Sequence, residues 1–171
     1  MSTTTVLTKD ELIASLQNEV RILLHLAGKV DRNKLDYRPT PKQRSIIELL
    51  RYVSVNGPGL GRVVKEGKFD LAAWQASLDA VKSVDFDQTL SAIEKQSSGY
   101  AEMLGGLSEA DFRAEIEAFG NKTSRGAFIV NAGLCGSAAY RMQLFLYLKS
   151  CGLEELNTMN LWAGVDAPWQ D

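Results

Sequence analysis

Apolar residues recur every three or four positions over most of this 171-residue sequence. That spacing puts them on one side of an α-helix, whereas a half-buried strand requires strict alternation. The first such segment begins at Thr8, which forms a capping-box pattern with Glu11. The segment runs to about Lys29, and its apolar face consists of Leu12, Leu16, Val20, Leu23 and Ala27. The sequence therefore predicts an amphipathic first helix.

A second helix is predicted to begin after Ser45, which repeats the capping-box pattern with Glu48. Its apolar stripe consists of Ile46, Leu49, Leu50, Val53, Leu60 and Val64. Pro58 interrupts this stripe, and a proline inside a helix removes a backbone donor and clashes with the carbonyl four residues earlier. We therefore expect the second helix to bend or break at Pro58.

Residues 67–85 form a connection that is too long for a tight turn between neighbouring helices. Asp70 precedes a run of spaced apolar residues, which predicts a short helix inside this crossover. The third long helix follows, and its seam residues alternate between spacings of three and four: Leu90, Ile93, Ser97, Tyr100, Leu104 and Leu107. Between residues 108 and 121 the pattern is mixed and indicates a short helical turn and an extended piece.

The last long helix is predicted over residues 125–150, and its apolar residues occupy every side of the helical wheel. Such a helix is either central in the fold or part of an oligomer interface. Gly152 is a natural stop, and residues 157–162 are too apolar to be frayed. The expected fold is all-α: a four-helix bundle in one domain, 1–171, with a long crossover between helices 2 and 3. Residues 1–7 and the tail 157–171 are expected to lie outside the bundle helices.

The composition excludes several classes of partner. The chain has 19 Lys and Arg against 21 Asp and Glu, so it has no basic excess for nucleic acid. No apolar run reaches the roughly 20 residues of a membrane-spanning helix, and the first residues do not resemble a secretory signal. We therefore expect a cytoplasmic protein without a membrane partner. Phosphate-binding glycine loops, dinucleotide fingerprints and Cys-x-x-Cys patterns are absent from the sequence, so no cofactor is expected.

The sequence contains one histidine and two cysteines. His25 falls opposite the apolar face of its helix, so we expect a solvated surface side chain rather than a functional one. Cys135 and Cys151 are about 24 Å apart on a continuous helix, at 1.5 Å per residue, which is beyond disulfide reach. We expect two buried thiols, and a reactive thiol is the alternative.

A stripe of small and polar residues on the last helix is the candidate binding site. Its members recur at helical spacing: Ala132, Gly136, Tyr140, Gln143 and Tyr147. A buried hydroxyl or amide without a partner costs about 1–3 kcal/mol, so these groups must face either a neighbouring helix or a cavity. Packing across the bundle and a ligand-lined cleft both remain open. Arg141 lies on another side of the wheel, where a salt bridge is expected.

Two motifs resemble the DinB-like superfamily. They are SIIELLRY at residues 45–52 on the second helix and AYRMQLFLYLKSCG at residues 139–152 on the last. The second is similar to the family's ending, in which a histidine precedes Arg-x-Gln, a Tyr-Leu-Arg or Tyr-Leu-Lys stretch and a glycine. Order and spacing are preserved from about residue 9 to 152, so the resemblance covers most of the chain.

This resemblance implies a DinB-like bundle with an up-down-down-up course, usually a dimer. Many members hold a divalent metal with three histidines, one from the second helix and two, four residues apart, from the last. Residue-by-residue matching places Tyr52, Gly136 and Tyr140 at these positions, and none of the three is a good ligand. We therefore expect a homodimer that is metal-free, without cofactor and non-catalytic. Its candidate cleft for a small molecule or a partner consists of Tyr52, Tyr140, Gln143 and Tyr147.

Two other functions remain open from the sequence. The first is a metal- or thiol-dependent transferase related to DinB-like enzymes, with Cys135, next to a ligand position, as the natural nucleophile. The second is a purely structural homodimer, which is favoured if side chains fill the cleft.

Overall fold

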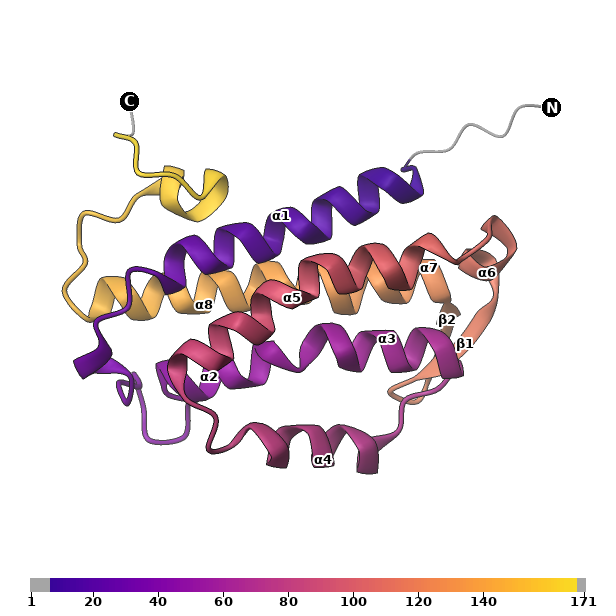
Figure 1. The fold of residues 1–171 in the computed structure, drawn as a ribbon, viewed down its shortest axis with the longest axis horizontal. Helices are drawn as coiled ribbons and strands as arrows, with labels where there is room; N and C mark the ends of the chain where they lie inside the picture. The colour runs from indigo at the N-terminus through magenta and orange to yellow at the C-terminus, as the bar shows by residue number, and fades with distance from the viewer. Residues whose placement is uncertain (1–6, 169–171) are drawn as a thin grey trace.

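Four helical rods form a bundle in the computed structural model, which describes residues 7–168 (Figure 1). The rods are α1 (Lys9–Ala27), the pair α2 (Ile46–Ser54) and α3 (Asn56–Glu66), α5 (Phe86–Gly105), and a last rod of α7 (Arg125–Phe128), a π-helical segment (Ile129–Cys135) and α8 (Gly136–Ser150). α1 packs against α5 and α8, and α2–α3 pack against the same two rods from the other side. The predicted all-α, four-helix architecture is confirmed.

The connections contain smaller elements. These are a 3-10 turn (Arg32–Lys34), α4 (Leu71–Val81), α6 (Glu109–Arg113), strands β1 (Glu115–Ala118) and β2 (Asn121–Ser124), and a π turn (Met159–Ala163). α4 is the short helix expected in the crossover, and it runs along the outside of α2–α3 (Figure 1). β1 and β2 form an antiparallel hairpin, with Ala118 opposite Asn121. The helical turn and extended piece expected before residue 121 are thus α6 and β1.

The helix starts follow the predicted local chemistry. Thr8 and Glu11 form a complete capping box on α1, and Ser45 and Glu48 form one on α2. Asp70 caps α4 by accepting a hydrogen bond from a backbone N–H in its first turn. The predicted apolar face of α1 is buried in full: Leu12, Leu16, Val20, Leu23 and Ala27.

The second rod breaks at Val55, one turn earlier than Pro58. Pro58 lies in the first turn of α3, where the missing N–H has no helical partner to lose. Proline cannot donate to the carbonyl of Ser54, four residues before it. The side chain of Gln96 on α5 supplies the donor, with its Nε2 3.1 Å from the Ser54 carbonyl and 2.9 Å from that of Val53. A buried glutamine therefore stabilises the break at Val55 by donating to two carbonyls at the end of α2.

The last rod was predicted as one helix, either central in the fold or part of an oligomer interface, and the structure divides it into three helical segments. Residues 129–135 are π-helical, with hydrogen bonds between residues five apart. In α8, Met142 is 39% exposed and Leu146 is 53% exposed. The rod stands at a corner of the bundle, where neighbouring helices cover only part of its circumference. The alternative of a central helix is therefore wrong, because apolar residues occupy the outer face of this corner helix, whereas the alternative of an oligomer interface stays a prediction.

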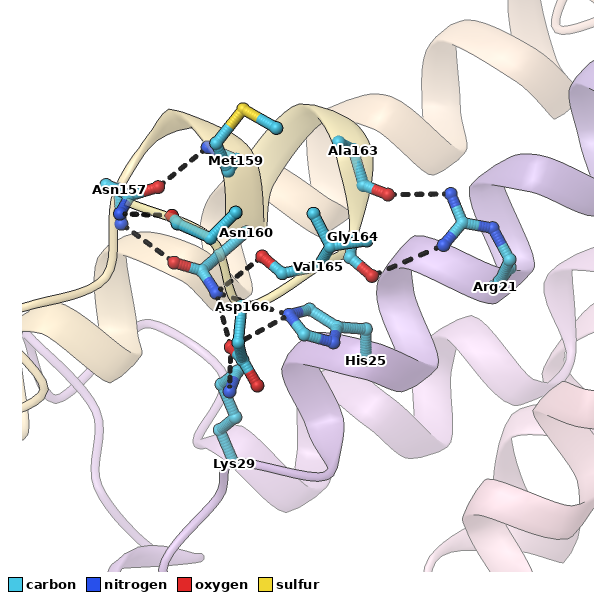
Figure 2. A network of polar contacts seen from close by, with 11 residues as sticks. Arg21, His25, Lys29, Asn157, Met159, Asn160, Ala163, Gly164, Val165 and Asp166 are labelled. Carbon is cyan, nitrogen blue, oxygen red and sulfur yellow. Dashed lines mark hydrogen bonds and ion pairs between the residues drawn. The ribbon is translucent and has the colours of Figure 1, made fainter. Parts of the chain in front are cut away.

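The C-terminal segment after residue 156 packs along α1 (Figures 1 and 2). Leu161 is buried, and Arg21 donates hydrogen bonds to the carbonyls of Ala163 and Gly164 at 2.8 and 3.3 Å. The expectation that the start of this tail is ordered is therefore confirmed, whereas residues 169–171 lie outside the described part. Within residues 7–168, no helix is both long and apolar enough to cross a membrane.

The prediction that His25 is a solvated surface side chain was wrong. Its side chain is only 18% exposed because the C-terminal segment covers the polar face of α1 (Figure 2). Nε2 of His25 lies 3.6 Å from the carboxylate of Asp166 and 3.3 Å from the amide nitrogen of Asn160. Burial lowers the pKa of His25, and the positive charge of Lys29 lowers it further. The helical wheel of α1 alone shows nothing of this cover, since it comes from a segment more than 130 residues away.

Candidate functional site

A cavity of about 280 Å³ opens between the second rod, α4, the hairpin turn and the last rod. Its lining consists of Tyr52, Asn56, Gly59, Leu60, Val63, Phe69, Trp74, Phe119, Phe128, Ala132, Gly136 and Tyr140. None of these twelve side chains carries a charge, and half of them are aromatic. A concave, mostly apolar space with a few polar groups is the usual form of a small-molecule site.

Six aromatic rings follow one another around this cavity, and we call them the aromatic collar. In order of contact they are Tyr140, Tyr52, Trp74, Phe69, Phe119 and Phe128. Consecutive ring centroids are separated by 5.2, 5.7, 6.3, 4.6 and 6.3 Å, distances at which aromatic pairs attract each other. The collar thus joins five parts of the chain into one wall: α2, the segment after α3, α4, the hairpin turn and the last rod.

Small residues complete the collar on the last rod. Ala132 and Gly136 lie between Phe128 and Tyr140 at four-residue spacing, so all four share one side of the rod. A Cβ atom added to Gly136 meets no atom within 4 Å. The space beside Gly136 is therefore open, and it belongs to the cavity.

A second glycine allows the opposite wall to form. A Cβ atom on Gly59 of α3 would lie 2.5 Å from the indole ring of Trp74. Only glycine lets Trp74 approach the α3 backbone this closely. Trp74 in turn contacts Tyr52 edge to face, at an interplanar angle of 83°.

Tyr52 and Tyr140 are the two predicted site residues that the structure brings together. Their hydroxyl oxygens are 3.3 Å apart, and the guanidinium carbon of Arg44 lies 3.9 Å from the centre of the Tyr52 ring. Burial, followed by the hydrogen bond with Tyr52, raises the pKa of Tyr140 to about 12. Both effects favour the protonated phenol, so Tyr140 is a neutral hydrogen-bonding group at neutral pH.

Gln143 and Tyr147 form a separate pair outside the lining of this cavity. The amide of Gln143 donates a hydrogen bond of 2.6 Å to the hydroxyl of Tyr147. Tyr147 is only 3% exposed and packs edge to face against Tyr37, with ring centroids 6.1 Å apart. Since Tyr140 and Tyr147 are two helical turns apart, they lie on the same side of α8 but at different positions along its axis. Of the four residues of the predicted cleft, Tyr52 and Tyr140 therefore line the cavity, whereas Gln143 and Tyr147 pack elsewhere in the bundle.

The positions that the DinB-like resemblance assigns to metal ligands do converge in space. Tyr52, Gly136 and Tyr140 all line the cavity. These residues do not fit a divalent cation, because the phenol of Tyr140 stays protonated and glycine has no side chain. Among residues 7–168, no cluster of three or more His, Cys, Asp and Glu side chains is suited to hold a metal.

The two cysteines also differ from expectation. Both are free thiols, but Cys135 is exposed and Cys151 is only partly buried, so the prediction of two buried thiols was wrong. Cys135 precedes Gly136 in the chain, yet it is not part of the cavity lining. Burial raises the pKa of Cys151, which favours the unreactive thiol form.

Arg141 forms the expected salt bridge, in an unexpectedly buried place. Its Nε is 2.9 Å from a carboxylate oxygen of Glu19, and the two side chains are 5% and 12% exposed. Arg141 also donates a hydrogen bond to the carbonyl of Leu161 in the C-terminal segment. Burial raises the pKa of Glu19, while the charge of Arg141 opposes that shift. The pair therefore joins α1, α8 and the C-terminal segment.

Sequence reasoning missed four members of the collar: Phe69, Trp74, Phe119 and Phe128. Phe69 and Phe119 lie in connections, and Trp74 and Phe128 lie on α4 and α7, so no local pattern placed them beside Tyr52 and Tyr140. One available signal was Phe119-Gly120, because a bulky aromatic residue is unusual in a hairpin turn.

Comparison of the sequence with protein-family models found no match, and comparison with curated proteins found none either. Among solved structures, the chain is similar to a DinB-like protein from Bacillus subtilis, with a TM-score of 0.66 and 22% sequence identity. The similarity covers 86% of this chain and 95% of that chain. The chain therefore has a DinB-like helical-bundle fold.

Proposed function

We propose that this chain is a non-catalytic, metal-free DinB-like protein that binds a small, uncharged, largely apolar molecule in the aromatic cavity. The open space beside Gly136 carries the proposal. In a packed bundle, a small residue at such a position lets a neighbouring side chain approach closely. Here nothing approaches, so the small residue leaves room for a ligand at the place where the resemblance puts a metal.

The charge distribution favours an uncharged ligand. The twelve lining residues include no carboxylate and no cation, so an ion would lose its water without gaining a counter-ion. Arg44 already occupies one face of the Tyr52 ring, and its positive charge disfavours a second cation nearby. The hydroxyl pair of Tyr52 and Tyr140 and the amide of Asn56 offer hydrogen bonds to one polar group on the ligand.

The same lining argues against catalysis in this cavity. It contains phenols, an indole, an amide and hydrocarbon side chains, but no carboxylate, imidazole, thiol or amine that could act as base or nucleophile. The raised pKa of Tyr140 also makes its phenol a poor base at neutral pH. Cys135, the nucleophile of the alternative transferase, is exposed and outside the lining. The geometry thus supports the binding protein over the transferase.

The proposal is tested by titrating the protein with N-phenylnaphthylamine, an uncharged apolar dye that fluoresces when buried. We expect saturable binding of one dye per chain. Gly136→Leu should reduce the affinity at least about tenfold, because the new side chain occupies the cavity. Gly105→Leu is the matched control, since its Cβ also meets no atom within 4 Å but lies outside the lining. Equal dye binding by both variants would disprove the proposed site.

We further propose that the protein is a cytoplasmic homodimer. The exposed Met142 and Leu146 give α8 an apolar outer face, which a second copy can cover. Both cysteines are free, as is usual in a reducing compartment. The oligomeric state follows from the mass of the protein in solution.

A further inference from the structure

The hairpin turn beside the cavity contains a residue in an unfavourable backbone conformation. β1 and β2 are joined by the two residues Phe119 and Gly120, whose φ angles are 53° and 75°. Two-residue turns with positive φ at both positions favour Asn, Asp or Gly, because a bulky side chain is strained there. Phe119 is the only non-glycine residue with positive φ among residues 7–168. Turn formation alone therefore does not explain the phenylalanine.

Burial does not explain it either, because Phe119 is 65% exposed. Neither the backbone conformation of the turn nor burial in the core therefore accounts for the phenylalanine at this position. Strained residues of this kind concentrate at ligand sites, where the surrounding structure holds them in place.

The surrounding structure does hold this turn against the cavity. The N–H of Glu117 donates to the carbonyl of Gly67 at 3.0 Å, and the N–H of Phe69 donates to the carbonyl of Glu117 at 3.3 Å. β1 is thereby fixed beside the segment that follows α3. As a result, the Phe119 ring lies 4.6 Å from the Phe69 ring, and it forms one wall of the cavity.

We infer that the ligand of this cavity is a planar aromatic molecule and that Phe119 contacts it from the hairpin turn. This inference rests on the proposed function and names the class of ligand. The collar rings are tilted by 35° to 83° to one another, so they present both faces and edges around the cavity. A flat aromatic ring can meet such walls in offset or edge-to-face geometry, whereas a globular hydrocarbon gains only area. A bound ring also covers the exposed face of Phe119, which explains an aromatic residue at that position.

The test compares two uncharged competitors that carry the same hydroxyl group, planar naphthol and globular adamantanol. Each displaces N-phenylnaphthylamine from the wild-type protein, and we expect naphthol to bind at least about tenfold more tightly. Equal affinities, or tighter binding of adamantanol, overturn the planar class. Displacement of the dye by tetramethylammonium at lower concentration than naphthol also overturns it, because the collar would then be a cation site.

The role of Phe119 is tested with Phe119→Asn, which removes the ring and installs a residue that the turn favours. We expect roughly tenfold weaker naphthol binding, a clearly smaller loss of adamantanol binding, since adamantanol loses only contact area, and a melting temperature equal to or above that of the wild type. A melting temperature that falls together with the affinity would make Phe119 a structural residue and overturn its assignment. Leu71→Asn is the control, because Leu71 is similarly exposed at 69% and lies outside the cavity lining.

The outcomes separate this inference from the proposed function. If Gly136→Leu blocks the dye but Phe119→Asn leaves naphthol binding intact, the cavity is a binding site and Phe119 is not part of it. If the wild-type protein shows no saturable dye binding, both proposals fail.

Discussion

Replacing Tyr140 by alanine distinguishes an open cavity from a packed core. Tyr140 is partly buried, and its contacts in the cavity wall are an edge-to-face pair and a long hydroxyl contact with Tyr52. An aromatic pair contributes about 0.5–1.5 kcal/mol and a hydrogen bond about 0.5–1.5 kcal/mol, with a 3.3 Å contact at the low end. Alanine is also the better helix former, which returns up to about 0.7 kcal/mol. We therefore expect a loss of about 1–2 kcal/mol.

Tyr147→Ala on the same helix is the matched comparison. Tyr147 is 3% exposed, packs against Tyr37 and accepts a hydrogen bond from Gln143, so its removal leaves a true core cavity. Losses for such aromatic deletions are about 3–5 kcal/mol.

Urea denaturation measures both losses. At a slope near 2 kcal/mol per molar urea, the midpoint should fall by about 0.5–1 M for Tyr140→Ala and about 1.5–2.5 M for Tyr147→Ala. If the Tyr140→Ala loss reaches about 3 kcal/mol at unchanged slope, the space beside it is packed core. The binding proposal is then refuted in favour of a structural dimer.

Five further predictions concern two glycines of the last rod, His25, the metal content and the oligomeric state. Gly136→Ala should raise the free energy of unfolding by about 1 kcal/mol, because alanine favours the helix and its Cβ meets open space. Gly133→Ala should lower the free energy of unfolding, since its Cβ would lie 2.9 Å from a leucine side chain. Thermal denaturation measures both changes. The lowered pKa of His25 means that the unfolded chain binds a proton more readily, so stability should fall as the pH is lowered through the ordinary histidine pKa of 6.5, and less so in His25→Gln. Elemental analysis after dialysis should find well below one equivalent of zinc or nickel per chain. Light scattering should give twice the chain mass of 18.8 kDa, and Leu146→Lys should shift it towards the monomer; a monomeric wild type contradicts the dimer.

The sequence alone determined the features that depend on neighbours within one or two helical turns. Capping boxes at Thr8 and Ser45 formed as predicted, because donor and acceptor are three residues apart. The buried face of α1 was predictable for the same reason, since the helical period sets which residues share a side. The proximity of Tyr52 and Tyr140 was also predictable, because the DinB-like motifs place these two positions close together.

Only the tertiary structure decided what covers each face and where space remains. The cover over His25 and the wall formed by Phe119 come from distant segments, so no local pattern contains them. Gln143 and Tyr147 have the same helical spacing as the cavity residues, yet Tyr147 packs against a different neighbour, Tyr37, and Gln143 donates a hydrogen bond to Tyr147. The physical reason is that helical periodicity specifies which side of a helix a residue faces. A cavity depends instead on which other parts of the chain pack against that side at each position along the helix axis.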